Sequence, residues 1–464
     1  MLEVWENKLK DNFGTAVVDK KAALENEVKD LPRYVSEYLL GYFCDDGVTE
    51  ENLKQMHSYI RDCRIDGRAK EKARHMLQTS FRMKVIDKFR VKINLTNKNK
   101  PENSLQIPSM GIDDAQVFDS ILKDNERLLI DGLWGLGEVK YDPELKSIEL
   151  IKFKPFQLAN INVDDFIEVR SQFSREGWIN ALVSTIGLNH KAYSTREKFI
   201  LISRLLPMVE NNLFMMEFGP PGTGKTYAFE NLSSYSRVIS GSKVTAPQLF
   251  YNLNNNQAGL LLQYDVILFD EIDKVKSTGI DEEVVNKLYQ YLASGKFDRG
   301  GVEKNSNCGI VMVGNLPKGK LSKREMLDQL LHERLKHAAF LDRLAGVIPG
   351  WDLEGIKDSS VSLTKHYGFT ADYFSEILNR LRRENYDYVL NRIDLKNAGI
   401  RDESNIKRMV SAFIKLIYPD GKINKEELKE ITEYAVEYRQ FVIDQNYYIN
   451  GKEDYNKRIE FEIK

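Results

Sequence analysis

Cysteine is scarce in this chain of 464 residues. The three cysteines, Cys44, Cys63 and Cys308, form no CxxC pair and follow no regular spacing. This pattern argues against a disulfide framework and against a cysteine-based zinc site, and it favours a reducing compartment.

Long apolar runs are lacking as well. No segment approaches the roughly 18 uninterrupted apolar residues that indicate a membrane-spanning helix. The first residues, MLEVWENKLK, carry acidic side chains and no apolar stretch, unlike a signal peptide. We therefore expect a cytoplasmic protein with no membrane partner.

The net charge is small, but its distribution is uneven. The chain carries −2 overall, whereas residues 61–100 hold 13 Lys/Arg against 4 Asp/Glu, a local charge of +9. This stretch predicts a basic face near the N-terminus that contacts nucleic acid, and an ordinary solvated helical face is the alternative. The candidate contacts are Arg64, Arg68, Lys70, Lys72 and Arg74.

Hydrophobic patterning divides the chain into five predicted segments. Runs rich in β-forming residues at 89–95, 128–141 and 147–153, separated by turn-like stretches, contrast with helical spacing before them. In order, the segments are a helical region (1–81), a small β-rich module (82–158), a connector (159–194), an α/β core (195–352) and a helical lid with a C-terminal tail (353–464).

Three short apolar runs define the predicted core. LFMMEFG (213–219), DVILFDE (265–271) and GIVMVGN (309–315) each have the length and composition of a buried parallel strand. Helical segments lie between them, and Ser194 with Glu197 forms a capping box before a helix. The pattern predicts an α/β fold with a parallel sheet, preceded by an α+β N-terminal region.

The strongest motif is GPPGTGKT, which ends the first apolar run and opens a helix. Its glycines let backbone N–H groups wrap around phosphates. Lys225 would reach the β- and γ-phosphates of ATP, and the Thr226 hydroxyl would bind Mg²⁺. The predicted loop residues are Gly219, Pro220, Pro221, Gly222, Thr223, Gly224, Lys225 and Thr226.

The other two runs end in polar residues, at the strand ends where ligands bind in α/β sheets. Asp270 would contact the nucleotide's Mg²⁺ through water, and Glu271 would polarise the attacking water as general base. Asn315, at the end of the third run, would orient that water, and a simple strand-end cap is the alternative.

Arg343 lies between two apolar segments in AAFLDRLAGVIPGW (338–351). In a ring of subunits such an arginine would reach the neighbour's γ-phosphate and stabilise charge in the transition state. A structural ion pair with Asp342 or another acid is the alternative, and Arg334 is a weaker candidate for the same role.

Arg401, in the C-terminal helical part, is predicted to contact phosphate from the lid, with Lys407 and Arg408 as rivals.

A basic turn precedes the third apolar run. Lys296, Arg299 and Lys304 flank Gly300-Gly301, which predicts a β-hairpin. A basic hairpin that faces the pore of a ring would follow a nucleic-acid backbone without sequence preference, and a solvated hairpin is the alternative.

Two stretches resemble metal-binding motifs but lack the required spacing or ligands. His332 and His337 are five residues apart and do not share a helix face, so they do not form a zinc-protease motif. PDGKINKEELKE resembles the end of an EF-hand but lacks acidic residues at the first ligand positions. The six histidines are scattered in the sequence, and none is assigned to a metal.

The order of these motifs over residues 195–445 resembles that of AAA+ ATPases. The sequence around Arg343, DRLAGVIPG, and around Arg401, AGIR, resembles the ATPase part of Lon. Further stretches are similar to the BrxL family, Lon-related proteins of bacteriophage-exclusion defence systems. They are PRYVSEYLLGYFC (32–44), SRLLPMVENN (203–212), QLFYNL (248–253), GKFDRG (295–300) and FLDRLAGVIPGWD (340–352).

The resemblance implies an Mg-ATP-dependent ATPase that forms a homo-oligomeric ring, six subunits being the expected number and stacking of rings being left open. It also implies double-stranded DNA and other defence-system proteins as partners, with an N-terminal DNA-binding region. Lon and the longer BrxL proteins continue into a Lon-type domain, which in Lon carries a Ser-Lys dyad. This chain ends at Lys464 without such a segment, so we expect no protease activity.

Three functions remain open. The first is a motor that translocates on or remodels duplex DNA. The second is a nucleotide-gated DNA clamp with slow hydrolysis, which needs the same site. The third is a protein unfoldase that works with a separate protease, although the corresponding pore segment, residues 252–262, is polar at its centre.

Overall fold

The computed structural model describes residues 2–25, 31–44, 47–95, 101–130, 132–156, 161–240, 244–253, 257–278, 281–317 and 321–464. The chain forms two compact units. The first, here called the sheet unit, comprises Met1–Gly14, Asp19–Lys21 and Asn162–Lys464, and the second, the barrel unit, comprises Thr15–Val18 and Ala22–Ile161. The predicted boundary between residues 158 and 159 lies outside the described residues, and the five-part division stays a prediction.

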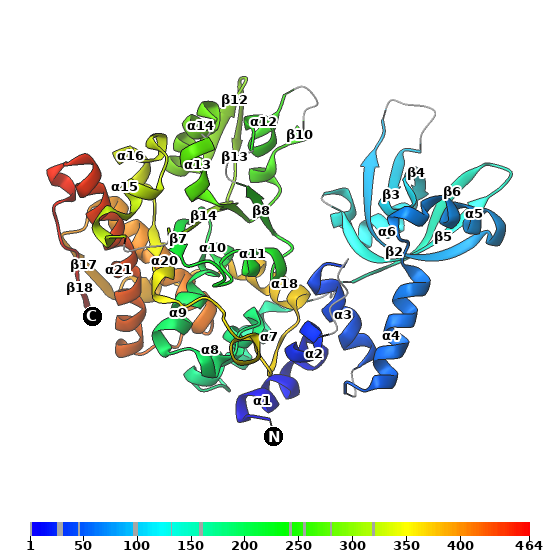
Figure 1. The fold of residues 1–464 in the computed structure, drawn as a ribbon, viewed down its shortest axis with the longest axis horizontal. Coiled ribbons are helices and arrows are strands. Elements are labelled where there is room, and N and C mark those ends of the chain that lie inside the picture. The colour runs from blue at the N-terminus through cyan, green and yellow to red at the C-terminus, as the bar shows by residue number, and fades with distance from the viewer. Residues whose placement is uncertain are drawn as a thin grey trace. The chain divides into compact units, whose positions relative to one another are not determined.

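A five-stranded parallel sheet forms the centre of the sheet unit (Figure 1). Its spatial order is β15 (Gly346–Ile348), β7 (Phe214–Gly219), β14 (Gly309–Asn315), β11 (Val266–Asp270) and β8 (Ser236–Ser240). The three predicted apolar runs therefore form strands, and the predicted mixed α/β architecture with a parallel sheet is confirmed.

The strand register places the functional motifs together. Asn315 pairs with Gly219 across β14 and β7, and Phe269 pairs with Met312 across β11 and β14. Because β14 lies between β7 and β11, the end of β14 stands between the loop after β7 and the acidic pair after β11. All three C-terminal strand ends meet at one edge of the sheet, where ligands bind in such folds.

Helices cover the sheet, and β7, β11, β14 and β15 are buried almost throughout, as continuous apolar strands require, whereas the edge strand β8 is partly exposed. Helix α13 packs against β14, and α21 packs against β15. Side chains such as Ile267, Phe269 and Met312 are fully buried in the resulting core. The Ser194–Glu197 capping box forms as predicted and begins α9 (Thr195–Ser203).

The remaining elements of the sheet unit follow one another along the chain. The helices are α1 (Val4–Phe13), α7 (Val163–Arg170), α8 (Arg175–Ile186), α10 (Leu206–Val209), α11 (Tyr227–Asn231), α12 (Ala246–Leu249), α13 (Ile272–Thr278), α14 (Glu282–Ser294), α15 (Met326–Leu330), α16 (Ala338–Leu341), α17 (Ser359–Ser362), α18 (Ala371–Leu381), α19 (Asp387–Leu390), α20 (Ile400–Ile417) and α21 (Lys425–Asn450). The further strands are β9 (Tyr251–Asn252), β10 (Gln257–Ala258), β12 (Lys296–Arg299), β13 (Val302–Asn305), β16 (Tyr367–Phe369), β17 (Ile393–Lys396) and β18 (Glu460–Ile463).

The C-terminal part is less purely helical than predicted. Strands β17 and β18 pair antiparallel, with Ile393 opposite Ile463 and Leu395 opposite Phe461. These strands are short and far apart in the sequence, so local apolar spacing does not reveal their pairing.

The barrel unit is a closed five-stranded barrel. Its spatial order is β2 (Arg82–Ile93), β3 (Asn103–Ile107), β4 (Ile112–Val117), β6 (Ser147–Pro155) and β5 (Leu133–Asp142). Neighbouring strands are antiparallel except β4 and β6, which are parallel. Fully buried Val85, Phe89, Leu105, Val139 and Leu150 fill its interior. The helices of this unit are α3 (Arg33–Phe43), α4 (Glu50–Cys63), α5 (Lys70–Ser80) and α6 (Asp119–Asp124), and β1 (Val17–Asp19) with α2 (Lys20–Glu25) crosses the division between the units.

Two details of the barrel differ from the sequence prediction. The β-rich run predicted to begin at residue 128 does not start there, because Glu126–Leu129 form a 3₁₀ turn and β5 begins at Leu133. Leu128 is fully buried and anchors this turn in the barrel core. Strands β3 and β4 were not expected, since their short polar-rich sequences give a weak local signal. Across the described residues, no helix combines the length and the apolar character needed to cross a bilayer.

Candidate functional site

The predicted phosphate loop lies between β7 and the short helix α11. Gly222 and Gly224 have φ angles of 78° and 74°, a left-handed conformation that residues with a Cβ rarely adopt. The two glycines thus permit the loop to fold back on itself with its N–H groups free to turn inward.

Lys225 is folded into this loop and is only 7% exposed. Its Nζ donates to the carbonyl oxygens of Gly219 (3.1 Å) and Pro220 (2.7 Å) and to Oδ1 of Asn315 (3.2 Å). Burial lowers the pKa of Lys225 from its ordinary value. The ammonium group is therefore held at the sheet edge by carbonyl and amide oxygens that phosphate oxygens can replace.

Thr226 and Asp270 lie in direct contact. The Thr226 hydroxyl donates to Oδ2 of Asp270 at 3.0 Å, and Oδ1 of Asp270 accepts from the backbone N–H of Glu271 at 2.7 Å. Hydroxyl and carboxylate oxygens are ligands that suit Mg²⁺, directly or through its water molecules. The two residues that the sequence assigns to magnesium therefore lie close enough to serve one ion.

Glu271 has an unusual backbone conformation for a residue with a side chain, with φ of 57°. Backbone strain of this kind is concentrated at functional sites. Its carboxylate forms an ion pair with Lys274, one turn later in the chain. In this arrangement the carboxylate of the predicted general base contacts an exposed lysine side chain.

Asn315 contacts both the phosphate loop and the segment that follows β11. Its Oδ1 accepts from Lys225, and its backbone N–H donates to Oδ1 of Asp273 at 3.0 Å. No role for Asp273 was predicted from the sequence. This carboxylate fixes the strand end from which the Asn315 side chain projects.

A buried ion pair beneath the phosphate loop was also missed. The side chains of Arg204 and Glu217 are each 1% exposed and lie 2.7 Å apart, from Nη2 to Oε1. Nη1 of Arg204 also donates to the carbonyl oxygen of Thr223 in the loop, at 2.9 Å. A glutamate within the apolar run LFMMEFG is the sequence signal for this pair, because a buried carboxylate requires a partner.

The predicted finger arginine lies in a second cluster. Arg343 donates to the carbonyl oxygen of Ala339, and its Nε is buried without a hydrogen-bond partner in the part of the chain described. Asp342 forms ion pairs with Arg401 and with Arg439 (3.2 Å). Burial, and then the nearby charge of Arg401, lowers the pKa of Arg343.

This second cluster is separate from the phosphate loop of the same chain. Over the described ranges, the hydrogen bonds and ion pairs of Arg343 and Arg401 go to Ala339 and Asp342 and none goes to residues 219–226. The side chain of Arg401 is 58% exposed. The structure therefore brings Arg401 to the predicted finger rather than to the phosphate loop.

The rival residues are engaged elsewhere. Arg334 forms an ion pair with Glu282 at 3.0 Å. Lys407 pairs with Glu403 at 2.6 Å, and Arg408 donates to the carbonyl oxygen of Asn212 at 3.5 Å.

The predicted basic hairpin forms from β12 and β13. Gly300 and Gly301 make its turn with φ angles of 60° and 78°. Lys296 lies 3.5 Å from Glu303, and Arg299 lies 3.3 Å from Glu283. The Lys304 ammonium lies over the ring of Tyr251, 5.6 Å from its centroid. The hairpin is confirmed, and its contact with nucleic acid stays a prediction. The predicted pore segment, residues 252–262, includes residues 254–256, which lie outside the described residues.

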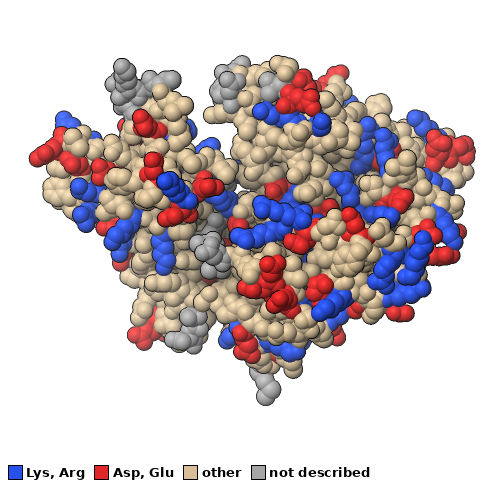
Figure 2. All heavy atoms as spheres, turned by 180° about the vertical axis from the view of Figure 1, so that it is seen from behind, with Lys and Arg blue, Asp and Glu red and all other residues tan. Residues whose placement is uncertain are grey.

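The predicted DNA-contacting residues of the barrel unit differ in how exposed their side chains are and in whether other groups of the fold bind them. Arg68 is exposed and pairs with Asp66 at 3.0 Å. Arg74 is bound to the carbonyl oxygens of Met110 (2.8 Å) and Gly111 (2.5 Å), so it supports the fold. Lys70 and Lys72 are exposed at the start of α5, and Arg64 is half-buried at the end of α4. Figure 2 shows basic and acidic side chains interspersed on one face of the molecule, so basic contacts must be judged residue by residue.

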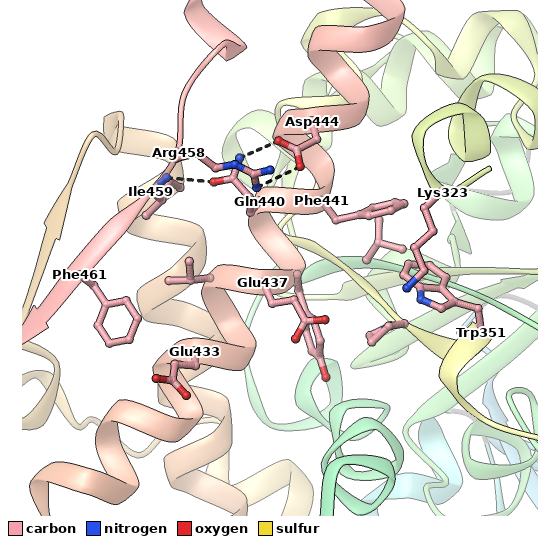
Figure 3. Close-up of a pocket in the computed structure, with 14 residues that line it drawn as sticks. Lys323, Trp351, Glu433, Glu437, Gln440, Phe441, Asp444, Arg458, Ile459 and Phe461 are labelled. Atoms are coloured by element: carbon pink, nitrogen blue, oxygen red, sulfur yellow. Dashed lines mark hydrogen bonds and ion pairs between the residues drawn. The ribbon is translucent and has the colours of Figure 1, made fainter.

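A cavity of about 440 Å³ lies beside α21, away from the predicted nucleotide residues (Figure 3). Trp351 and Phe441 form part of its wall, with ring centroids 4.9 Å apart. Arg458 and Asp444 pair at 3.3 Å on its rim. Residues 219–226, 270, 271 and 315 do not line it, so it is separate from the predicted site.

Two family models match the chain. The model described as "Lon-like protease BrxL-like, ATPase domain" matches residues 148–460. The model described as "BREX system Lon protease-like protein BrxL N-terminal" matches residues 11–141.

Curated relatives match nearly the whole chain. "Lon-like protease BrxL" of Escherichia coli O9:H4 (strain HS) is 32% identical over 457 residues, which cover 96% of this chain and 65% of that protein. The protein of the same name from Bacillus cereus (strain H3081.97) is 30% identical over 465 residues, covering 97% of this chain and 68% of that protein. This chain thus spans about two thirds of the length of these relatives.

Among solved structures, a full-length MCM homolog from Methanopyrus kandleri aligns with a TM-score of 0.44 and 11% identity, covering 78% of this chain and 77% of that one. The family models and the curated relatives, not this distant likeness, decide the assignment. The chain belongs to the BrxL family.

Proposed function

We propose that this chain is a ring-forming AAA+ ATPase that hydrolyses Mg-ATP and translocates on or remodels double-stranded DNA in bacteriophage-exclusion defence, together with other defence-system proteins. The observation that carries the proposal is the convergence of Lys225, Thr226, Asp270 and Asn315 at one edge of the parallel sheet. Membership of a family with an ATPase domain supports it. We assign no proteolytic step to these residues.

The phosphate loop and Lys225 bind the nucleotide's phosphates. Loop N–H groups contact phosphate oxygens, and the Lys225 ammonium exchanges its carbonyl partners for the β- and γ-phosphates. Thr226 and Asp270 fit Mg²⁺ because their oxygens are hard ligands within 3.0 Å of each other. A Mg²⁺ ion held by these two residues would supply positive charge to offset the charge that develops on the phosphates.

Glu271 and Asn315 act on the attacking water. The Glu271 carboxylate accepts the proton of that water once it leaves Lys274, and the Asn315 amide orients the water toward the γ-phosphate. The position of β14 between β7 and β11 supports this assignment, since it sets Asn315 between phosphate and base.

Arg343 and Arg401 complete the site of a neighbouring subunit. Both belong to one cluster around Asp342, and Arg343 keeps a buried Nε without a partner in the described structure. A γ-phosphate presented by the next subunit would contact the half-buried guanidinium of Arg343 and balance the positive charges of Arg343 and Arg401. In this proposal Arg401 acts at the subunit interface, and does not contact phosphate from the lid of its own chain.

Double-stranded DNA is the proposed partner of the barrel unit and the basic hairpin. The barrel's strand order, with the parallel pair β4 and β6 and with α6 before β5, resembles that of five-stranded OB-type barrels, which bind oligonucleotides. Positive charge for phosphate contacts comes from exposed Arg68, Lys70 and Lys72 on this unit, and from exposed Lys296 and half-buried Lys304 on the hairpin.

A nucleotide-gated DNA clamp is the second candidate. The contact between Glu271 and Lys274 favours it, because the carboxylate must leave this partner before it can act on the attacking water. Both candidates use the same nucleotide residues and the same partner.

Steady-state ATP hydrolysis by the purified protein, with and without duplex DNA and at low and moderate salt, tests the proposal. Strong stimulation by DNA that fades as salt rises supports a motor working on DNA. Unchanged turnover with DNA bound in the same samples supports the clamp. Unchanged turnover without DNA binding would contradict DNA as the partner and favour the unfoldase, and absence of turnover with Mg-ATP would overturn the ATPase itself.

A further inference from the structure

Two histidines that are far apart in the sequence meet a glutamate near the N-terminus. Glu3 is the N-cap residue of α1, His190 begins a 3₁₀ turn (His190–Ala192), and His366 precedes β16. One ligand atom from each residue lies within 4.8 Å of those of the other two. All three belong to the sheet unit.

The distances within this cluster are short. Nε2 of His190 lies 3.3 Å from Oε2 of Glu3, and the rings of His190 and His366 have centroids 4.6 Å apart. Ligands of a tetrahedral zinc ion, each about 2.0–2.1 Å from the metal, stand roughly 3.4 Å from one another. The Glu3–His190 distance already has this value, and small side-chain rotations would bring His366 to it.

His190 is an unusual buried group. It is 4% exposed, and its Nδ1 is buried with no hydrogen-bond partner among the residues described. Buried polar atoms without partners are rare in proteins and call for an explanation. Because no described acceptor holds a proton on Nδ1, the ring is not committed to one tautomer, and Nε2, which faces Glu3, can serve as the metal ligand.

Glu6 supports the cluster from behind. Its carboxylate is 2% exposed, and its Oε1 lies 3.2 Å from Nδ1 of His366 and accepts from the backbone N–H of Tyr367 at 3.1 Å. A histidine that binds a metal typically donates its other ring N–H to a carboxylate, which fixes its orientation. Glu6 thus leaves Nε2 of His366 available as a ligand.

The cluster is reachable from solvent. Glu3 and Trp5 line a cavity of about 410 Å³, together with Lys8 and Phe173. The Trp5 indole donates to Oε2 of Glu3 at 2.6 Å and holds that carboxylate in place. Neither histidine is among its lining residues, so Glu3, with its side chain 28% exposed, is the member of the cluster that a metal ion would reach first from this cavity.

We propose that Glu3, His190 and His366 bind one divalent transition-metal ion, zinc being the expected metal. Two imidazoles and one carboxylate suit zinc and related ions, whereas magnesium favours sites made of oxygen alone. The ion would tie α1 to the segments before α9 and β16, and so fix the N-terminus of the sheet unit. This site is independent of the proposed nucleotide site, which uses other residues.

Lys191 is the competing partner of Glu3. Its Nζ lies 2.5 Å from Oε1 of Glu3, but its side chain is 62% exposed and can move away. Metal binding replaces this ion pair, so Lys191→Ala should bind the metal at least as tightly as the unaltered chain.

Cobalt(II) titration of the full chain, stripped with EDTA and free of nucleotide, tests the site. The expected result is one Co²⁺ per chain with visible absorption of a four- or five-coordinate ion, displaced by Zn²⁺, and a thermal midpoint raised by Zn²⁺. The double variant His190→Gln/His366→Gln should lose this signal. His57→Gln/His75→Gln, which removes two exposed histidines, and Asp270→Ala, in the proposed magnesium site, should keep it.

Absence of stoichiometric Co²⁺ absorption would overturn the proposal, as would full binding by His190→Gln/His366→Gln. If that double variant does not fold, Glu3→Gln decides the matter, since it leaves both histidines in place. It should weaken Co²⁺ binding tenfold or more, and unchanged affinity would show that the cluster is an ion-pair network without a metal site.

Discussion

The phosphate-loop cluster and the arginine cluster of the sheet unit are built in opposite ways. Lys225, Thr226, Asp270 and Asn315 bond to one another or to their own loop, and they form a nearly closed set within one chain. Arg343 instead donates to the carbonyl oxygen of Ala339, and Arg401 pairs with Asp342. The side chain of Arg401 is largely exposed. Over the described residues, no hydrogen bond or ion pair joins the two clusters within one chain. The proposed function therefore requires that they meet between subunits.

Replacing the finger arginine should have the largest effect. Arg343→Ala should lower ATP hydrolysis by about 10³-fold or more, while nucleotide affinity changes little, because the guanidinium acts on transition-state charge. Fluorescent-nucleotide binding and steady-state turnover measure the two quantities. Loss of nucleotide affinity equal to the loss of turnover would place Arg343 in ground-state binding instead.

Glu271→Gln tests the phosphate-loop half. Loss of the general base should reduce turnover by about 10²–10⁴-fold and leave ATP bound, because the amide cannot accept the water's proton. Glu426→Gln, at an exposed glutamate on α21, is the matched control and should hydrolyse normally. Wild-type turnover by Glu271→Gln would remove this residue from its assigned role.

Glu217→Gln probes the support beneath the loop. Removing the charge leaves Arg204 buried without its carboxylate, which should cost about 3–5 kcal/mol of unfolding free energy. Urea unfolding measures this loss. Arg204→Met/Glu217→Gln removes both charges and should recover part of the stability, whereas an unchanged unfolding free energy in the single variant would show that the pair supports nothing.

These residues also mark what the sequence could predict. The three strands and the hairpin were predictable because each is a short local pattern, an apolar run or a glycine turn, that ends in a recognisable motif. The closeness of Thr226 to Asp270 followed from parallel strands that end at one edge. These features were predictable because each arises from a short stretch of sequence. Residues that end neighbouring parallel strands then lie at the same edge of the sheet.

Pairings between distant segments were not predictable in this way. Closure of the barrel depends on β3 and β4, whose polar-rich sequences resemble loops. The meeting of His190 with His366, and of Arg401 with Asp342, joins residues with no common motif. Such contacts are set by tertiary packing, which single-sequence periodicity does not contain.

Arg401→Ala should have the smallest effect of the series. We expect about a tenfold loss of turnover. The exposed Arg401 should stabilise transition-state charge less than the half-buried guanidinium of Arg343 does. Lys407→Ala, on the same helix, is the control and should be nearly neutral. Loss of nucleotide affinity in a monomeric preparation of Arg401→Ala would instead place this arginine at its own chain's phosphate site.

The most direct test of the account is a mixing experiment with two inactive variants. Lys225→Ala lacks phosphate binding but keeps the arginine cluster, and Arg343→Ala has the reverse defect. If sites form between subunits, mixed assemblies should recover a measurable fraction of wild-type ATP hydrolysis, since some interfaces then contain both functional halves. Mixed assemblies that form, as shown by co-purification of differently tagged subunits, and still hydrolyse no ATP would contradict completion of the site by a neighbouring subunit.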